Sequence, residues 1–142
     1  MSPTEQPSPL RVLLVEDYPD LAEVMAEFLR AEGLDVTTAL SGREALEAAA
    51  ASRPQLLLCD LNLPDMSGLD VVRGLRSRPA TEEVYAVILT AMRETEPARR
   101  SEAEALGVNA FMFKPITLEA IRTLVETLAT RPLTSPSSQK TE

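Results

Sequence analysis

Four short apolar runs in this chain each stop on a polar residue, and this pattern constrains the fold more than any other feature. The runs are Leu13-Leu14-Val15 before Glu16 and Asp17, Leu56-Leu57-Leu58-Cys59 before Asp60, Val87-Ile88-Leu89 before Thr90, and Ala110-Phe111-Met112-Phe113 before Lys114. Runs of this length, bounded by turn residues, are typical of strands buried on both faces of a parallel sheet. Ligands bind at the carboxyl edge of such sheets, so the pattern gathers three acids, a hydroxyl and an ammonium at one edge.

Helical patterns lie between these runs and complete an alternation of strands and helices. A further strand is predicted at Val36–Leu40, and apolar spacing with capping residues predicts helices at 19–32, 42–51, 68–76, 97–107 and 118–130. This alternation predicts an α/β fold with a doubly wound, five-stranded parallel sheet in the order 2-1-3-4-5, the flavodoxin-like (βα)5 arrangement.

The helices differ in how much apolar surface they offer. In the first helix the predicted buried stripe consists of Leu21, Val24, Met25, Phe28 and Leu29. In the fourth helix the apolar residues are mainly Ala98, Ala103, Ala105 and Leu106. We therefore expect the fourth helix to pack loosely and to serve as a moving or partner-facing element. At the start of the second helix, Ser41 and Glu44 are predicted to form a capping box.

Composition limits the classes of partner and the location of the protein. The chain has 142 residues, a formal net charge of −8, one cysteine and no histidine. Nucleic-acid backbones are bound by basic surfaces, so direct binding of DNA is not expected. The sequence has no apolar stretch near the roughly 18 residues of a membrane span and no signal-peptide core, so we expect a cytoplasmic protein without membrane contact. Residues 1–9 and 132–142 are predicted to be disordered tails around one folded domain at 10–131.

The acidic residues at the strand ends have a physical consequence. If the first and third strands are neighbours, their ends lie roughly 5 Å apart, and Glu16, Asp17 and Asp60 converge. Two carboxylates about 4 Å apart repel by roughly 4 kcal/mol at an effective dielectric near 20, so three of them require a cation. Oxygen ligands without histidine favour a hard ion, and a site with few protein ligands and room for water fits Mg²⁺ better than Ca²⁺.

Such a site favours phosphoryl transfer. A carboxylate beside Mg²⁺ is able to attack phosphorus and form an aspartyl phosphate. Phosphoryl transfer needs positioning and neutralisation of the phosphoryl oxygens, which Lys114 and Mg²⁺ would supply, while Thr90 would add a hydroxyl donor.

Each polar residue also has a purely structural explanation when taken alone. Glu16 and Asp17 fit a solvated turn before a helix N-terminus, Asp60 fits a turn or a cap, and Lys114 fits a loop. Phe111 fits a core. The functional hypothesis rests on the combination of these residues, because the polar residues occur together at the ends of separate predicted strands.

The motifs at these strand ends resemble those of the receiver domain of two-component response regulators, of the chemotaxis-regulator type. The matching stretches are Val12–Asp17, Leu58–Gly68, Ile88–Ala91 and Phe113–Pro115. The resemblance covers about residues 10–131 and implies the (βα)5 receiver fold.

The resemblance implies roles for the acidic residues and a source for the phosphoryl group. Asp60 would accept it from a phosphohistidine on a sensor histidine kinase or a histidine phosphotransfer protein. Glu16, Asp17, Asp60 and the backbone carbonyl of Asn62 would hold Mg²⁺. Lys114 would pair with the phosphoryl oxygens, and the peptide bond from Lys114 to the following proline would be cis.

The resemblance also implies a switch. Thr90 would turn toward the phosphoryl group and allow Phe111, where the family often has tyrosine, to rotate inward. This movement would change the surface made by the fourth helix, the fifth strand and the fifth helix, which would bind a downstream protein target.

Two other functions stay open on the sequence. A haloacid-dehalogenase-like Mg²⁺ phosphohydrolase also uses an aspartate nucleophile, but such enzymes carry a second acid two residues later, where this chain has Asn62. A receiver-like interaction module that is never phosphorylated would not need Thr90 and Lys114 beside the acids. The preferred hypothesis is a signalling module that catalyses only its own phosphorylation and dephosphorylation. It would stand alone or come from a larger regulator or hybrid kinase, and a homodimer is one option for its assembly.

Overall fold

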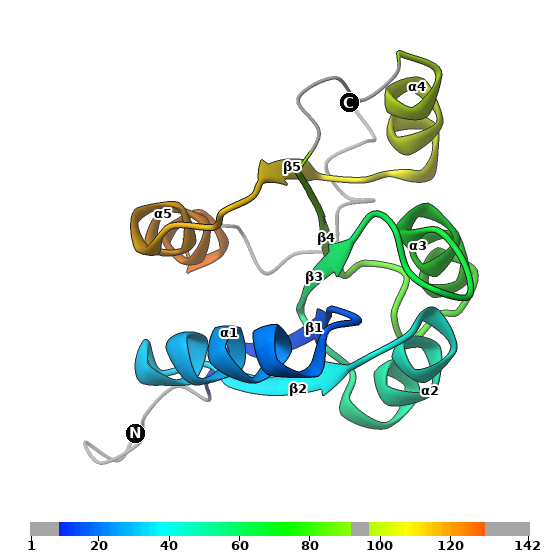
Figure 1. Ribbon diagram of the computed structural model, residues 1–142. Coiled ribbons are helices and arrows are strands. Elements are labelled where there is room, and N and C mark those ends of the chain that lie inside the picture. Colours follow the sequence, from blue (N-terminus) through cyan, green and yellow to red (C-terminus); the bar gives the residue numbers. More distant parts are fainter. Residues whose placement is uncertain (1–8, 92–96, 130–142) are drawn as a thin grey trace.

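The computed structural model describes residues 9–91 and 97–129, in which strands and helices alternate along the chain (Figure 1). The strands are β1 (Arg11–Val15), β2 (Asp35–Ala39), β3 (Leu56–Asp60), β4 (Tyr85–Thr90) and β5 (Ala110–Phe113). The helices are α1 (Pro19–Ala31), α2 (Gly42–Ser52), α3 (Gly68–Arg76), α4 (Pro97–Leu106) and α5 (Leu118–Ala129). All strand pairs are parallel and the sheet order is β2-β1-β3-β4-β5, which confirms the predicted fold.

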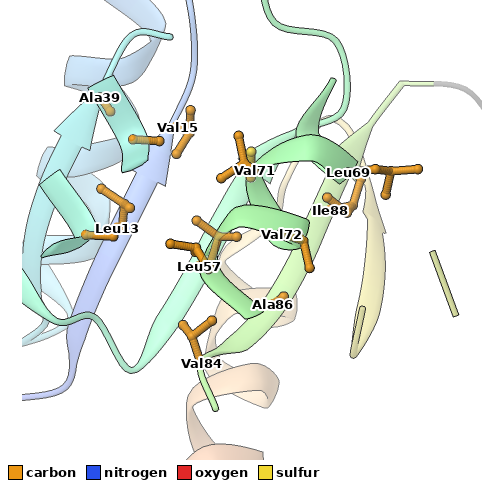
Figure 2. Packing of buried hydrophobic residues seen from close by; sticks show 14 of the residues in the cluster. Leu13, Val15, Ala39, Leu57, Leu69, Val71, Val72, Val84, Ala86 and Ile88 are labelled. Carbon is orange, nitrogen blue, oxygen red and sulfur yellow. The ribbon is translucent and has the colours of Figure 1, made fainter. Parts of the chain in front are cut away.

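Helices cover both faces of the sheet (Figure 1), with α1 and α5 on one side and α2, α3 and α4 on the other. Alternate residues of each central strand enter separate cores, so that Leu57 and Ile88 face α3 while Leu58 and Leu89 face α1 and α5. Figure 2 shows Val72 and neighbouring side chains of α3 packed over β3 and β4. Burial on both faces explains why the strands appear in the sequence as continuous apolar runs.

The predicted buried stripe of α1 is wrong at two positions. Leu21 and Val24 are 40% and 63% exposed, whereas Ala22, Ala26 and Leu29 are buried. The small side chains of Ala22 and Ala26 allow α1 to approach the sheet closely, and Leu21 and Val24 lie on the exposed flank of the helix. In α4, Ala103 is buried, whereas Ala98 and Ala105, two of the other apolar residues of this helix, are exposed.

Helix starts depend on side-chain caps, and one differs from the prediction. The Ser41 hydroxyl accepts a hydrogen bond from the Glu44 N–H at 3.1 Å, as expected. The Glu44 carboxylate, however, accepts from the Leu40 N–H at 2.8 Å and not from Ser41, so the box is shifted by one residue. A reciprocal capping box between Ser67 and Asp70 begins α3.

A glycine inside α3 shows how closely the helices pack. Gly74 costs about 1 kcal/mol relative to alanine in a helix, and the sequence offers no reason for it. In the structure a Cβ atom at this position would lie 2.8 Å from Leu46 Cδ2 of α2. Gly74 therefore permits the close approach of α2 and α3.

The predicted tails at 1–9 and 132–142 lie outside the described residues, apart from Pro9, so the domain limits of 10–131 stay a prediction. Within the described residues, none of the helices combines the length and apolar character that crossing a bilayer requires.

The two leucines of α1 give a direct test of the corrected helix face. Leu29→Ala should lower the free energy of unfolding by about 2–5 kcal/mol, because Leu29 is 1% exposed and its loss leaves a cavity. Leu21→Ala in the same helix should cost less than about 1 kcal/mol. Urea denaturation of both variants measures the difference, and equal losses would show that both side chains lie in the core.

Candidate functional site

Strand register brings the predicted polar residues to one edge of the sheet. Val15 pairs with Cys59, so Glu16, the residue after β1, and Asp60, the last residue of β3, come next at this edge. On the other side, Asp60 pairs with Leu89 and Thr90 pairs with Phe113. The carboxyl ends of β1, β3, β4 and β5 thus meet where the sequence pattern predicted.

Three carboxylates form a compact cluster at this edge. One oxygen from each of Glu16, Asp17 and Asp60 lies within 4.8 Å of the others. Glu16 is fully buried and Asp60 is 9% exposed. Charged groups that are this far removed from water need partners, because desolvation disfavours the ionised form.

Lys114 provides a cationic partner for two of these acids. Its Nζ atom lies 3.0 Å from Glu16 Oε1 and 3.2 Å from Asp60 Oδ2. Burial acts to lower the pKa of Lys114, but the hydrogen bond that its ammonium donates to Glu16 and the negative charges of Asp60 and Glu16 outweigh this effect and raise the pKa. The side chain is therefore an ammonium at neutral pH.

Backbone contacts hold Glu16 in place. Its Oε2 atom accepts a hydrogen bond from the Tyr18 N–H at 3.3 Å, and its own N–H donates to the Ala39 carbonyl at 3.1 Å. Both oxygens of Glu16 thus already have a partner, because Oε1 accepts from Lys114 and Oε2 accepts from the Tyr18 N–H. A carboxylate oxygen has two lone pairs, so these bonds leave acceptor positions for a metal ion or its water.

The donor set fits Mg²⁺. One ammonium cannot neutralise three ionised carboxylates, and the cluster offers only oxygen atoms to an ion. Mg²⁺ holds its ligands at about 2.1 Å, so two ligands of one ion lie roughly 3 to 4 Å apart. A cluster no wider than 4.8 Å is close to this size. A divalent ion with oxygen ligands would remove the remaining repulsion.

Thr90 and Phe111, the two residues predicted to form a switch, lie in β4 and β5. Thr90 is 2% exposed, and its carbonyl accepts a hydrogen bond from the Lys114 N–H at 2.9 Å. Phe111 is half-buried, and the Arg100 guanidinium of α4 lies 5.2 Å from the centre of its ring. The Lys114–Pro115 bond is cis, as the resemblance implied. A backbone bond thus links β4 to the residue after β5, and Phe111 of β5 contacts α4 through Arg100.

The segment after β3 carries Asn62 and approaches the site closely. A Cβ atom at Gly68 would lie 2.4 Å from the Asp60 carbonyl oxygen, so the start of α3 can reach β3 only with glycine there. Asn62 forms a β-bridge with Ser67 across the loop.

Asp65 lies in the same loop, and the sequence predicts no functional role for it. Its carboxylate accepts hydrogen bonds from the backbone N–H groups of Gly42 and Arg43, and these bonds lower its pKa. An aspartate in a polar loop is common, so no sequence signal would have marked it.

Comparisons with known proteins agree on one family. The model of the response regulator receiver domain matches residues 12–126. The probable transcriptional regulatory protein TcrX of Mycobacterium tuberculosis is 39% identical over 80% of this chain and 47% of its own length. The DNA-binding response regulator MtrA of Mycolicibacterium smegmatis is 46% identical over 60% of this chain and 36% of its own length. The chain thus spans about half or less of these two relatives.

Solved structures are similar in fold over most of the chain. The chemotaxis protein CheY4 of Vibrio cholerae has a TM-score of 0.77 and 28% identity, covering 84% of this chain and 98% of that one. The receiver domain of the sensor histidine kinase PA1611 of Pseudomonas aeruginosa, with a magnesium ion coordinated in its active-site cleft, has a TM-score of 0.73 and 27% identity. It covers 84% of this chain and 96% of its own.

Thiol labelling tests the burial of the site. Burial raises the pKa of the Cys59 thiol, and the charges of Asp60 and Glu16 raise it further. Because the thiolate is the reactive form, we expect Cys59 to resist a disulfide-exchange reagent at pH 8 in the folded protein. It should react within seconds to minutes in urea, and equally rapid labelling without urea would show that this edge of the sheet is open.

Proposed function

The chain belongs to the response regulator receiver domain family, and we propose that Asp60 is the phosphoacceptor of a two-component phosphorelay. One observation carries the proposal: the Asp60 carboxylate, at the end of a central strand, lies within reach of both the Glu16–Asp17 acids and the Lys114 ammonium. Phosphoryl transfer to a carboxylate needs a metal site on one side and a fixed cation on the other. This arrangement supplies both.

The proposed reaction makes one bond and breaks one. An Asp60 oxygen attacks the phosphorus of a phosphohistidine, the new O–P bond forms, and the P–N bond breaks with its electron pair passing to the imidazole. Mg²⁺, when bound, neutralises charge on the phosphoryl oxygens. Asp17, Glu16 and the Asn62 carbonyl would hold the ion together with Asp60. Lys114, now paired with Asp60, would transfer its hydrogen bond to a phosphoryl oxygen.

Phosphorylation would then act as a switch. The phosphoryl group adds about −1.5 to −2 charges at the edge of the sheet. The Thr90 hydroxyl and the Lys114 ammonium would bond to phosphoryl oxygens in only one arrangement, and Phe111 would follow Thr90. These changes shift the population between two states of the α4-β5-α5 surface, which we propose binds the downstream target.

The phosphoryl donor must come from outside this chain, which contains no histidine. An apolar groove of about 520 Å³ adjoins the site, because Lys114 lines both. The flank of α1 and the segment after β5 form its walls, including the exposed residues Leu21 and Val24. We propose that a sensor histidine kinase or a histidine phosphotransfer protein contacts this groove. The proposal includes a cytoplasmic location, where ATP-dependent kinases supply phosphoryl groups.

The family match favours this function over the phosphohydrolase alternative. Asn62 stands two residues after Asp60 and cannot transfer a proton, so steady turnover of a phosphoester is not part of the proposal. TcrX and MtrA are named as transcriptional or DNA-binding regulators, but the chain matches 47% and 36% of them. We therefore propose a receiver role for this chain and no direct contact with nucleic acid. A homodimer stays a hypothesis.

Asp60→Asn tests the phosphoacceptor. With acetyl phosphate and Mg²⁺, the wild-type protein should gain 80 Da, the mass of HPO₃, and the variant should gain none, because an amide is not a nucleophile toward phosphorus. Asp20→Asn in the first turn of α1 is the matched control and should label like the wild type. Intact-protein mass spectrometry at neutral pH measures both, and undiminished labelling of Asp60→Asn would refute the assignment.

Val24→Asp tests the groove as the docking surface for the donor. The variant should raise the KM for a phosphohistidine donor by about ten-fold, because it places a charge on an apolar contact surface. Labelling by acetyl phosphate should not change, since a small molecule needs no docking surface. Glu23→Ala, at an exposed neighbouring position, serves as the control. Equal transfer rates for Val24→Asp and the wild type would exclude this groove.

A further inference from the structure

Asp65 joins the loop after β3 to the start of α2. Its Oδ1 atom accepts from the Gly42 N–H at 2.9 Å, and its Oδ2 atom accepts from the Arg43 N–H at 2.9 Å. These N–H groups belong to the first turn of α2, which has no intrahelical acceptors for them. The Met66 side chain packs against Gly42, where a Cβ atom would lie 2.3 Å from Met66 Cγ. The contact thus combines a two-fold hydrogen bond with close packing.

The base of the same loop is closed by its own hydrogen bonds. The Gly68 N–H donates to the Leu61 carbonyl at 2.7 Å, and the Leu63 N–H donates to the Met66 carbonyl at 3.2 Å. These bonds define the shape of the loop but not its position over the sheet. The Asp65 contact supplies a fixed point outside the loop.

The position of this fixed point matters because of the strand order. Across the sheet, β1 lies between β2 and β3. Because α2 follows β2 and the loop follows β3 along the chain, the Asp65 contact connects segments on both sides of β1. The end of β1 carries Glu16 and Asp17. The loop carries Asn62, whose carbonyl is a proposed Mg²⁺ ligand. The Asp65 contact therefore bridges across the end of β1, where the proposed Mg²⁺ ligands Glu16 and Asp17 lie.

We propose that Asp65 is a positioning residue: by fixing the β3–α3 loop to the N-terminus of α2, it sets the separation between the Asn62 main chain and the acids of β1 that Mg²⁺ requires. This inference rests on the proposed function. It assigns no contact between Asp65 and the ion or the phosphoryl group. The contact would raise the affinity for Mg²⁺ by holding a ligand in position, as residues that hydrogen-bond to metal ligands do in other proteins.

The test compares Asp65→Ala, Asp65→Asn and Glu47→Ala with the wild type. Asp65→Ala removes both acceptors, whereas Asp65→Asn keeps one carbonyl oxygen for one of the two N–H groups. Glu47→Ala removes an exposed carboxylate from the same helix, where it pairs with Arg43 at 3.7 Å, and serves as the charge control. Isothermal titration calorimetry gives the Mg²⁺ Kd of each protein. Amide hydrogen exchange in EDTA, followed by NMR at Leu63 and Gly68, reports the order of the loop without metal.

We expect Asp65→Ala to raise the Mg²⁺ Kd by about ten-fold and to speed exchange at both amides. Asp65→Asn should fall between the alanine variant and the wild type, and Glu47→Ala should match the wild type. A lower melting temperature with unchanged Kd would overturn the inference, as would a raised Kd with unchanged loop exchange. A wild-type protein that binds no Mg²⁺ would instead contradict the proposed function itself.

Discussion

The structure of this site depends on one electrostatic constraint: three carboxylates share a largely buried edge of the sheet with one ammonium. Lys114 satisfies part of this charge by bonding Glu16 and Asp60. We propose that a divalent cation balances the rest, because like charges at this separation repel strongly where water is excluded. The same imbalance explains how the site would respond to a phosphoryl group, whose added negative charge changes which partners Lys114 and Thr90 prefer.

The fold keeps the acids fixed while leaving other parts free to respond. The strands that present Glu16 and Asp60 are buried on both faces by helices, and such packed strand ends move little. By contrast, α4 buries Ala103 and contacts Phe111 through the exposed side chain of Arg100. A rigid reaction centre beside a weakly packed helix is an arrangement in which a small chemical change can be read at the surface.

Sequence patterns predicted the strands, their order and the convergence of the acids, because burial on both faces leaves an unmistakable apolar run with a polar end. They failed where side-chain size and tertiary contact decide the outcome. Leu21 and Val24 fit a helical stripe, yet the small residues Ala22 and Ala26 face the sheet, and period alone cannot distinguish these two faces. Gly74 and Asp65 act on a neighbouring helix, α2, so neither role could be read from the local sequence.

We propose that a divalent cation binds among Glu16, Asp17 and Asp60, and a titration of the melting temperature with free Mg²⁺ at constant ionic strength tests this assignment. A ligand that binds only the folded state stabilises it by about 2.7 kcal/mol at one hundred times its Kd. The melting temperature should therefore rise with Mg²⁺ along a one-site binding curve, while NaCl of matched ionic strength should not reproduce the rise. A melting temperature that is independent of Mg²⁺, or that responds equally to NaCl, would show that no divalent cation binds at this edge of the sheet.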